Sequence, residues 1–408
     1  MDYRESIDWL YATQMFGIKL GLENAARLLE SLEISETREL PKVIHVAGTN
    51  GKGSVCAFAE QILRDAGVRT GLFTSPHLVT YRERVRVSGE MIPEANVAAL
   101  LSTIRERIQD WEPHPTFFEI SLALAMRHFR DRECEVVVLE TGMGGRLDAT
   151  TAVGADVSVI TAISLDHQQW LGGTLREIAA EKAGILKADT PVVIADLHPE
   201  ARDVVGRRAL ALGIPCIEAH PLPQEWELGL KGPHQRENAA LAVEAVCRVE
   251  GERLTQEGIR RSLARASWPG RFQIVDDRVV LDGAHNPDAA TSLRRAWQEA
   301  FPDEKAHLVF GVAQAKDVDA IFANLLPIIA SVSLVPIASE RRLSSPAMKK
   351  SLESVAGTSV PTTVFATLPD AMESALRQRE RVLVAGSLFL VGETLSLLQG
   401  KGFETSLQ

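Results

Sequence analysis

Residues 42–54 have the sequence Lys-Val-Ile-His-Val-Ala-Gly-Thr-Asn-Gly-Lys-Gly-Ser, and this stretch decides the fold. The apolar run Lys42 to Val46 predicts a strand, and the following stretch Val55 to Ala66 predicts a helix. Glycines let a backbone fold closely around a phosphate, and the amides and dipole at a helix start favour its negative charge. We therefore expect a loop that binds ATP through Gly48, Thr49, Asn50, Gly51, Lys52, Gly53 and Ser54.

The spacing of this loop departs from the common GxxxxGK[ST] pattern. Val46 occupies the place of the first glycine, and Gly53 separates Lys52 from Ser54. Lys52 is expected to neutralise the terminal phosphates, and Ser54 is expected to reach a magnesium ion. The alternative is a glycine-rich turn with a purely structural role.

Outward from this loop, short apolar runs alternate with longer amphipathic stretches, as in βαβ units around a parallel sheet. The Trp268-Pro269-Gly270 stretch interrupts a helical pattern, after which the alternation restarts. We predict an α/β fold with two domains. Residues 1–267 would form a phosphate-loop, parallel-sheet ATPase domain, and residues 268–408 a smaller Rossmann-like α/β domain. The alternative is one sheet that runs through both halves. The predicted strands are Lys42 to Val46, Thr70 to Thr74, Glu135 to Leu139, Val157 to Thr161 and Pro191 to Ala195, then Val279 to Leu281, Leu308 to Phe310, Ser331 to Pro336, Thr362 to Phe365 and Val382 to Ala385, with a helix over Phe118 to Arg130.

Size and composition agree with two globular domains and exclude several classes of protein. The chain has 408 residues, 45% of them apolar and 24% charged, which exceeds the usual size of a single core. A net charge of -10 disfavours nucleic acid as a partner, because phosphate backbones bind clustered Lys and Arg. The four cysteines form no CxxC pair, and neither a secretory signal nor a membrane-spanning run is evident, so we expect a cytoplasmic protein.

Three further segments place polar residues just beyond predicted strands. They contain Ser75, Glu140 and the Asp166-His167 pair. Functional groups gather at the carboxyl ends of parallel strands, so these side chains are candidates for a metal site near the phosphate loop. Taken singly, Ser75 could cap a turn, Glu140 could pair with an arginine, and His167 could be an ordinary hydrogen-bonded histidine.

At this point a family resemblance appears along nearly the whole chain. The sequence resembles folylpolyglutamate synthases and dihydrofolate synthases, which belong to the muramyl-peptide ligase superfamily. Besides the phosphate loop, the matching motifs are Phe16-Gly-Ile-Lys-Leu-Gly-Leu22, Ser75-Pro-His-Leu78, Gly142-Met-Gly-Gly-Arg-Leu-Asp-Ala-Thr150, Glu181-Lys-Ala-Gly-Ile185, His234-Gln-Arg-Glu-Asn238, Leu281-Asp-Gly-Ala-His-Asn-Pro287 and Ser387-Leu-Phe-Leu-Val-Gly392.

The resemblance implies an ATP-dependent ligase in which a pterin carboxylate attacks the γ-phosphate and glutamate displaces the resulting acyl phosphate. Lys52 and a magnesium ion held by Ser54 and Glu140 would neutralise charge, and Ser75, Glu140 and His167 would hold a second magnesium ion. The resemblance also implies that Lys182 is carbamylated. Catalytic roles would then fall to Lys52, Glu140, His167 and Lys182, although an ordinary surface lysine is the alternative for residue 182.

Two further groups of residues carry roles that only the resemblance implies. The second domain would close over the nucleotide, with contacts from Asn238, Arg271, Asp282 and His285, although Asn238 could instead cap a helix and Asp282 a turn. The family pattern places the pterin against Thr116, Phe118, Asp148 and Ala149, which supply an aromatic face and a carboxylate. Phe118 could equally belong to the core. Thr151 stands where many relatives carry Asn, which leaves the geometry of its loop open.

Two other functions compete with this hypothesis. A muramyl-peptide ligase usually has a nucleotide-sugar domain ahead of its phosphate loop, and the 47 residues before Gly48 are too few for one. A nucleotide switch without catalysis would not need the metal positions. We expect a monomeric enzyme whose partners are small molecules: ATP, L-glutamate, and dihydropteroate and folates as the two acceptors.

Overall fold

The structure is a computed structural model that describes residues 1–17, 21–34 and 41–404. These residues form two compact units that are discontinuous in the sequence. Unit 1 comprises Met1–Ser75, Tyr81–Gly229 and Glu237–Ala266, whereas unit 2 comprises Pro76–Thr80, Leu230–Arg236 and the chain from Ser267 onward. The domain boundary between residues 267 and 268 stays a prediction; segments of the two units alternate along the chain, so no single cut separates the units.

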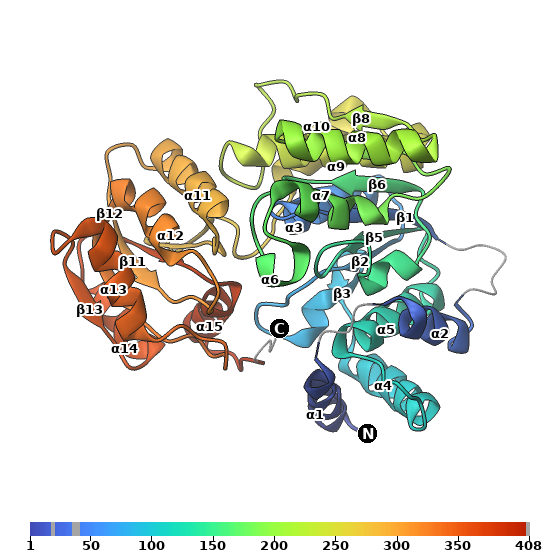
Figure 1. The fold of residues 1–408 in the computed structure, drawn as a ribbon, viewed down its shortest axis with the longest axis horizontal. Helices are drawn as coiled ribbons and strands as arrows, with labels where there is room; N and C mark the ends of the chain where they lie inside the picture. Colours follow the sequence, from blue (N-terminus) through green and yellow to red (C-terminus); the bar gives the residue numbers. More distant parts are fainter. Residues whose placement is uncertain (18–20, 35–40, 405–408) are drawn as a thin grey trace. The chain divides into compact units, whose positions relative to one another are not determined.

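Unit 1 is built on an eight-stranded sheet with the order β4-β3-β2-β5-β1-β6-β7-β8 (Figure 1). The strands from β2 to β8 in this order are parallel, and β3 and β4 add an antiparallel edge. The central strands are buried on both faces, which explains their continuous apolar sequence. The bounds are β1 Lys42–Ala47, β2 Thr70–Phe73, β3 Val85–Val87, β4 Glu90–Met91, β5 Val136–Glu140, β6 Val157–Ile160, β7 Val192–Ile194 and β8 Cys216–Glu218.

Helices cover both faces of this sheet. Helix α3 packs on β1, β2 and β5, and α10 packs on α3. On the other face, α1, α2, α4 and α5 form a core with every second residue of the strands, such as Val137 and Leu139 of β5. The bounds are α1 Tyr3–Ala12, α2 Glu23–Ser31, α3 Lys52–Asp65, α4 Glu94–Ile108, α5 Phe117–Asp131, α6 Gln168–Leu171, α7 Leu175–Lys182, α8 Pro199–Leu212, α9 His234–Glu250 and α10 Gln256–Arg265.

Unit 2 has its own six-stranded sheet with the order β13-β12-β11-β14-β10-β9, in which only β9 is antiparallel to its neighbour. The two sheets are separate, so the alternative of one continuous sheet is wrong. The bounds are β9 Gln273–Val275, β10 Val279–Leu281, β11 Ala306–Phe310, β12 Ile329–Leu334, β13 Thr362–Val364 and β14 Arg381–Ala385, with helices α11 Pro287–Ala300, α12 Val318–Leu325, α13 Ser345–Ala356, α14 Leu368–Leu376 and α15 Leu388–Gln399.

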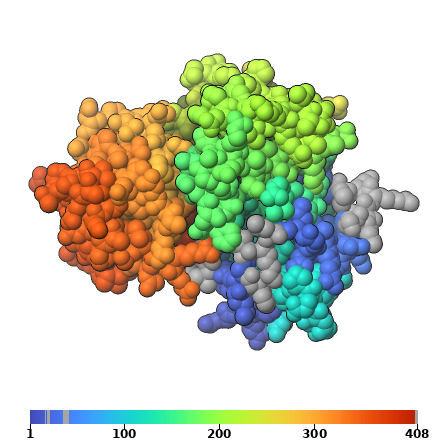
Figure 2. All heavy atoms as spheres, in the orientation of Figure 1, coloured from blue at the N-terminus to red at the C-terminus, as the bar shows by residue number. Residues whose placement is uncertain are grey.

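Alternate residues of the second sheet enter two different cores. Val280, Leu308 and Leu383 pack with α11, α12 and α13, whereas Val279 and Val309 pack with α14 and α15. This period of two is what a strand with both faces covered requires. Figure 2 shows one face of the molecule with all heavy atoms drawn as spheres.

The structure confirms the predicted fold class and changes several predicted boundaries. The helix expected from Val55 begins at Lys52, inside the phosphate loop. Strands β3, β4, β8 and β9 were not predicted; they lie at or next to sheet edges and are partly exposed, unlike the equally short but fully buried strands β7 and β10. Residues 18–20 of the motif that begins at Phe16 lie outside the described residues. No helix in the described ranges is long and apolar enough to cross a membrane.

Candidate active site

The topology of unit 1 brings the predicted site segments to one edge of its sheet. Strands β2, β5, β1 and β6 are adjacent and parallel. Glu140 is the last residue of β5, and Ser75, Gly48 and the Asp166-His167 pair follow the carboxyl ends of β2, β1 and β6. Four segments that are far apart in the sequence therefore start from neighbouring positions, as expected for a ligand site in a parallel sheet.

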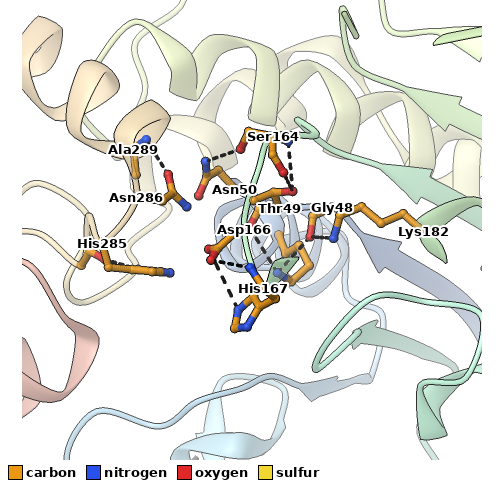
Figure 3. A network of polar contacts seen from close by, with 12 residues as sticks. Gly48, Thr49, Asn50, Ser164, Asp166, His167, Lys182, His285, Asn286 and Ala289 are labelled. Atoms are coloured by element: carbon orange, nitrogen blue, oxygen red, sulfur yellow. Dashed lines mark hydrogen bonds and ion pairs between the residues drawn. The ribbon is translucent and has the colours of Figure 1, made fainter. Parts of the chain in front are cut away.

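The phosphate loop is held in place by the segment that follows β6. The amides of Thr49 and Asn50 both donate to the Ala162 carbonyl oxygen, at 2.7 and 3.4 Å. The Thr49 hydroxyl exchanges hydrogen bonds with the backbone of Ser164 (Figure 3). The Thr161 hydroxyl donates to the Asn50 carbonyl at 2.7 Å. Because these first amides are already used, a phosphate has to be bound by the amides that follow.

Those following amides belong to the start of helix α3. Its N-cap is Gly51, which has a left-handed φ of 93° and no side chain to cap the helix. The first amides of a helix have no partner within the helix, so they remain available to an anion. Ser54 lies in this first turn and is buried. Gly51 to Ser54 thus form the strand-to-helix turn expected from the sequence, and their role in binding a phosphate stays a prediction.

Two glycines of the loop have no room for a side chain. A Cβ at Gly48 would lie 1.7 Å from the Thr161 hydroxyl oxygen, and a Cβ at Gly51 would lie 2.4 Å from the Asn238 side-chain oxygen. Asn238 lies inside α9, so the alternative that it caps a helix is wrong. Its side chain instead packs against the phosphate loop, which agrees with a role in nucleotide binding.

Lys52 and Lys182 share one acceptor. Their ammonium groups donate to the Gly48 carbonyl oxygen at 3.2 and 2.7 Å (Figure 3). Lys182 is buried, so it is not an ordinary surface lysine. Burial, together with the nearby charge of Lys52, lowers the pKa of Lys182 to about 7. Near neutral pH, a large share of Lys182 is therefore an uncharged amine.

Ser75 and Glu140 are brought together, as predicted. The Ser75 amide donates to the Glu140 carboxylate at 3.1 Å, and Glu140 is buried at the end of β5. His167 follows β6 with a left-handed φ of 51°, and its amide donates to the Asp166 carboxylate at 2.8 Å. Its side chain is 47% exposed.

The donor set fits a hard cation that is only partly held by the protein. Hydroxyl oxygens of Ser54 and Ser75 and the carboxylate of Glu140 are oxygen ligands of the kind that Mg²⁺ prefers. In the described part of the chain, no three His, Cys, Asp or Glu side chains are grouped to hold a metal ion by themselves. Mg²⁺ commonly binds through one or two carboxylates plus the phosphates of a substrate, so a nucleotide would have to complete such a site.

The loop over residues 142–151 contains two of the predicted pterin contacts, Asp148 and Ala149, and a third, Phe118 of α5, packs against it. Phe118 and Asp148 both lie against Gly142, where an added Cβ would meet their side chains at 2.7 and 3.2 Å. Phe118 also packs on Phe73 with ring centroids 5.6 Å apart, so part of the ring belongs to the core. The Thr151 hydroxyl donates to the Gly145 carbonyl at 2.7 Å, which closes the loop without the Asn of many relatives.

The Asp148 carboxylate is already engaged within the protein. One oxygen accepts the amide and hydroxyl protons of Thr150 at 3.1 and 2.6 Å, and the other accepts the Met143 amide at 2.8 Å. Burial raises the pKa of Asp148, while these hydrogen bonds oppose that change. Thr116 caps helix α5 by accepting the Glu119 amide, and Ala149 begins the 3₁₀ helix η4 (Ala149–Ala152). If Asp148, Thr116 and Ala149 contact a pterin as predicted, they would do so through backbone atoms or through side-chain atoms that these hydrogen bonds leave accessible.

The other predicted nucleotide contacts lie in unit 2, where they form one cluster. The Asp282 carboxylate accepts the amides of Phe272 and Ala284, both at 2.8 Å, so it does organise a turn after β10. Burial raises the pKa of Asp282, and the Arg271 guanidinium opposes this change. His285 Nδ1 donates to the Gly283 carbonyl at 2.7 Å.

Comparisons with known proteins agree with this geometry. Residues 46–204 match the Mur ligase middle domain, and residues 270–388 match the glutamate ligase domain of Mur ligases. A dihydrofolate synthase/folylpolyglutamate synthase from Bacillus subtilis is 31% identical over 96% of this chain and 98% of its own length. The chain belongs to the folylpolyglutamate synthase and dihydrofolate synthase family.

Other members of this family differ in length or carry ligands. A probable bifunctional folylpolyglutamate synthase/dihydropteroate synthase from Haloferax volcanii is 35% identical over 96% of this chain, which spans only 50% of that relative. A bifunctional folylpolyglutamate synthase/dihydrofolate synthase from Yersinia pestis, solved with AMPPNP and a Mn ion, is 30% identical, with a TM-score of 0.86 over 98% of each chain. The family, the ligase class and the fold expected from the sequence are thereby confirmed.

Sequence reasoning missed the residues that support this family's phosphate loop. Thr161 and Ser164 hold the loop, and His45 lies three residues before Gly48, buried in β1. A usable signal existed for each residue. Thr161 and Ser164 are small polar residues after the strand next to β1, and His45 is a polar residue in an otherwise apolar buried strand.

Proposed function

We propose that the chain joins L-glutamate to dihydropteroate and to tetrahydrofolate or other folates, at the expense of ATP, as a bifunctional dihydrofolate synthase and folylpolyglutamate synthase. A carboxylate oxygen of the acceptor attacks the γ-phosphorus of ATP, which gives an acyl phosphate and ADP. The amine of glutamate then attacks the acyl carbon, phosphate leaves, and an amide forms. The names of the relatives support both acceptors.

The observation that carries this proposal is the phosphate loop with two lysines on one carbonyl. The open amides at the start of α3 hold the nucleotide, and Lys52 neutralises charge as the γ-phosphoryl group transfers. Asn238 fills the space beside Gly51, so only glycine fits at this position of the loop. In unit 2, Arg271, Asp282 and His285 are proposed to contact the nucleotide when the enzyme closes.

We infer that two Mg²⁺ ions take part, held by Ser54, Ser75, Glu140 and His167. When bound, they would neutralise the oxygens of the transferring phosphoryl group. The protein's own contribution is to keep the Glu140 carboxylate buried and oriented by the Ser75 amide. Phe118, Asp148, Thr116 and Ala149 are proposed to line the pterin site. We further propose a monomer in the cytoplasm.

Carbamylation of Lys182 is part of the same proposal. An uncharged amine attacks CO₂ to form a carbamate and release a proton, and the lowered pKa of Lys182 supplies that amine. The charge of Lys52, which disfavours an ammonium at this place, stabilises an anionic carbamate instead. With ¹³C-bicarbonate, we expect a carbamate carbon resonance in the native protein and none in Lys182→Met.

The activity is tested by measuring phosphate release and product mass with each acceptor. Dihydropteroate plus glutamate and tetrahydrofolate plus glutamate are assayed side by side, with a sugar-nucleotide peptide as a third acceptor. Lys52→Ala is expected to lower turnover by at least about a hundredfold, since one preorganised charge contributes on that scale. The proposal fails if the native protein ligates no amine to either pterin acceptor, or if it accepts only the sugar nucleotide.

A further inference from the structure

His45 is the first residue of a hydrogen-bonded chain that the proposed reaction does not yet use. It lies in the middle of β1 with 1% of its surface exposed. Its Nε2 is 2.8 Å from the Thr150 hydroxyl oxygen, although 105 residues separate the two in the sequence. The Thr150 hydroxyl in turn lies 2.6 Å from the Asp148 carboxylate. A polar side chain inside a buried strand is thus connected directly to the acceptor loop.

The direction of this chain follows from counting protons. The Met143 and Thr150 amides donate to the two oxygens of Asp148, and the Thr150 hydroxyl donates to one of them at 2.6 Å. The single proton of the Thr150 hydroxyl therefore donates to Asp148, and its oxygen has to accept from His45. His45 is then a neutral imidazole with its proton on Nε2. Burial, and the nearby charge of Lys187, lower its pKa to about 3, which agrees with a neutral ring.

The chain connects the two loops that the reaction has to align. His45 stands three residues before Gly48, the first residue of the phosphate loop. Asp148 shapes the loop over residues 142–151 through the Met143 and Thr150 amides. The same loop is held from its other side by the Arg146 amide, which donates to the Glu181 carbonyl at 2.7 Å, next to Lys182.

We propose that His45 is a positioning residue for the acceptor, which acts through Thr150 to fix the Asp148 carboxylate and the loop around it. This inference rests on the proposed function, because it assigns the loop to the pterin acceptor. His45 would not contact the nucleotide or the reacting atoms. Its loss would therefore weaken acceptor binding while nucleotide binding is retained, a pattern that a general loss of stability does not give.

The tautomer of His45 can be measured without any activity. With ¹⁵N-labelled histidine, we expect one ring with the Nε2–H pattern that does not titrate between pH 6 and 8, and that disappears in His45→Gln. A titrating ring, or a proton on Nδ1, would overturn the proposed direction of the chain. This measurement stays valid even if the native protein ligates nothing, so it separates a failure of the chain from a failure of the proposed function.

Kinetics then test the positioning role. In His45→Leu and in Thr150→Val, we expect the KM for the acceptor to rise about tenfold, because a buried hydroxyl or carboxylate has lost one partner. The KM for ATP and kcat should stay within about twofold of the native values. His45→Gln, whose amide can donate from nearly the same place, should recover most of the loss. The acceptor KM of the double variant His45→Leu/Thr150→Val should be no higher than that of the more impaired single variant, because both changes break the same hydrogen-bonded chain.

A buried histidine elsewhere in unit 1 gives the matched control. His128 of α5 is also buried, and His128→Leu should leave the acceptor KM unchanged. The proposal is overturned if His45→Leu raises both KM values alike, if His45→Gln is as impaired as His45→Leu, or if neither variant changes the acceptor KM. Should His45→Leu fail to fold, Thr150→Val and His45→Gln still decide the question.

Discussion

Replacing Lys182 with methionine should make unit 1 more stable at low pH than at high pH, relative to the native protein. The folded-state pKa of about 7 lies below the usual value of 10.5. Below pH 7, both states carry the charge, and its burial destabilises the folded state by about 5 kcal/mol. As the pH rises from 7 towards 10.5, the folded state has lost its proton while the unfolded state keeps it, so this destabilisation is relieved.

The difference between two pH values isolates this effect. Between pH 6 and pH 9, the stability gained by Lys182→Met should fall by about 2.5 kcal/mol, as linkage between the two pKa values requires. Lost packing changes stability equally at both pH values. Urea unfolding in CO₂-free buffer measures the difference, with equal m-values as the check on a common unfolded state.

A matched substitution on the surface controls for general effects of pH. Lys349 of α13 is 47% exposed, so its ammonium stays hydrated in the folded state. For Lys349→Met, the stability difference from the native protein should be nearly the same at pH 6 and pH 9. If the stability difference for Lys182→Met is also the same at pH 6 and pH 9, burial does not destabilise the charged form of Lys182, and the argument for an uncharged amine is wrong.

Three further changes test other parts of the structure. Gly51→Ala should weaken ADP binding by more than about tenfold in calorimetry, because the new Cβ meets Asn238 and the left-handed φ is strained. Glu140→Gln should keep the fold but lower the apparent Mg²⁺ affinity in steady-state kinetics by about tenfold, because the amide carries no charge. Gly392→Ala should destabilise unit 2 by about 2 kcal/mol in thermal unfolding, because the new Cβ lies 2.0 Å from the Leu78 carbonyl oxygen.

Two glycines with open surroundings serve as controls for these alanine variants. A Cβ at Gly173 or at Gly402 would have no atom within 4 Å. Gly173→Ala should leave ADP binding unchanged, and Gly402→Ala should leave thermal unfolding unchanged. For Glu140→Gln, an unchanged Mg²⁺ dependence would mean that this carboxylate does not act as a metal ligand.

Much of the fold could be predicted because hydrophobic alternation and glycine spacing are local signals. The central strands of both sheets lie within a few residues of their predicted bounds. The strands β3, β4, β8 and β9 could not be predicted, because they lie at or next to sheet edges and lack the fully buried apolar run that identified the equally short strands β7 and β10. Nor could the sequence predict that segments 76–80 and 230–236 belong to unit 2, because only three-dimensional packing decides their place.

The candidate site divides in a similar way. Gly48 and Gly51 follow from the sequence pattern, because close backbone approach requires glycine there. The environment of Lys182 could not be derived from its helix, whose sequence is charged and looks exposed. Its ammonium group donates to the Gly48 carbonyl, 134 residues away, a contact that only the folded chain creates. The saturation of Asp148 likewise depends on amides that only the folded loop supplies.

The grouping of Pro76–Thr80 with unit 2 has a consequence for how the protein can be divided. The chain passes between the units after Ser75, Thr80, Gly229, Arg236 and Ala266. Leu78 belongs to a core with residues of β10, β14 and α15, and the Thr80 hydroxyl donates to the Glu404 carboxylate at 3.0 Å. A fragment that ends at residue 266 would expose Leu78 to water, and a fragment that begins at residue 267 would lack it. The two halves expressed separately would therefore each be incomplete, and a clean division of the protein would have to move residues 76–80 and 230–236 to the second half.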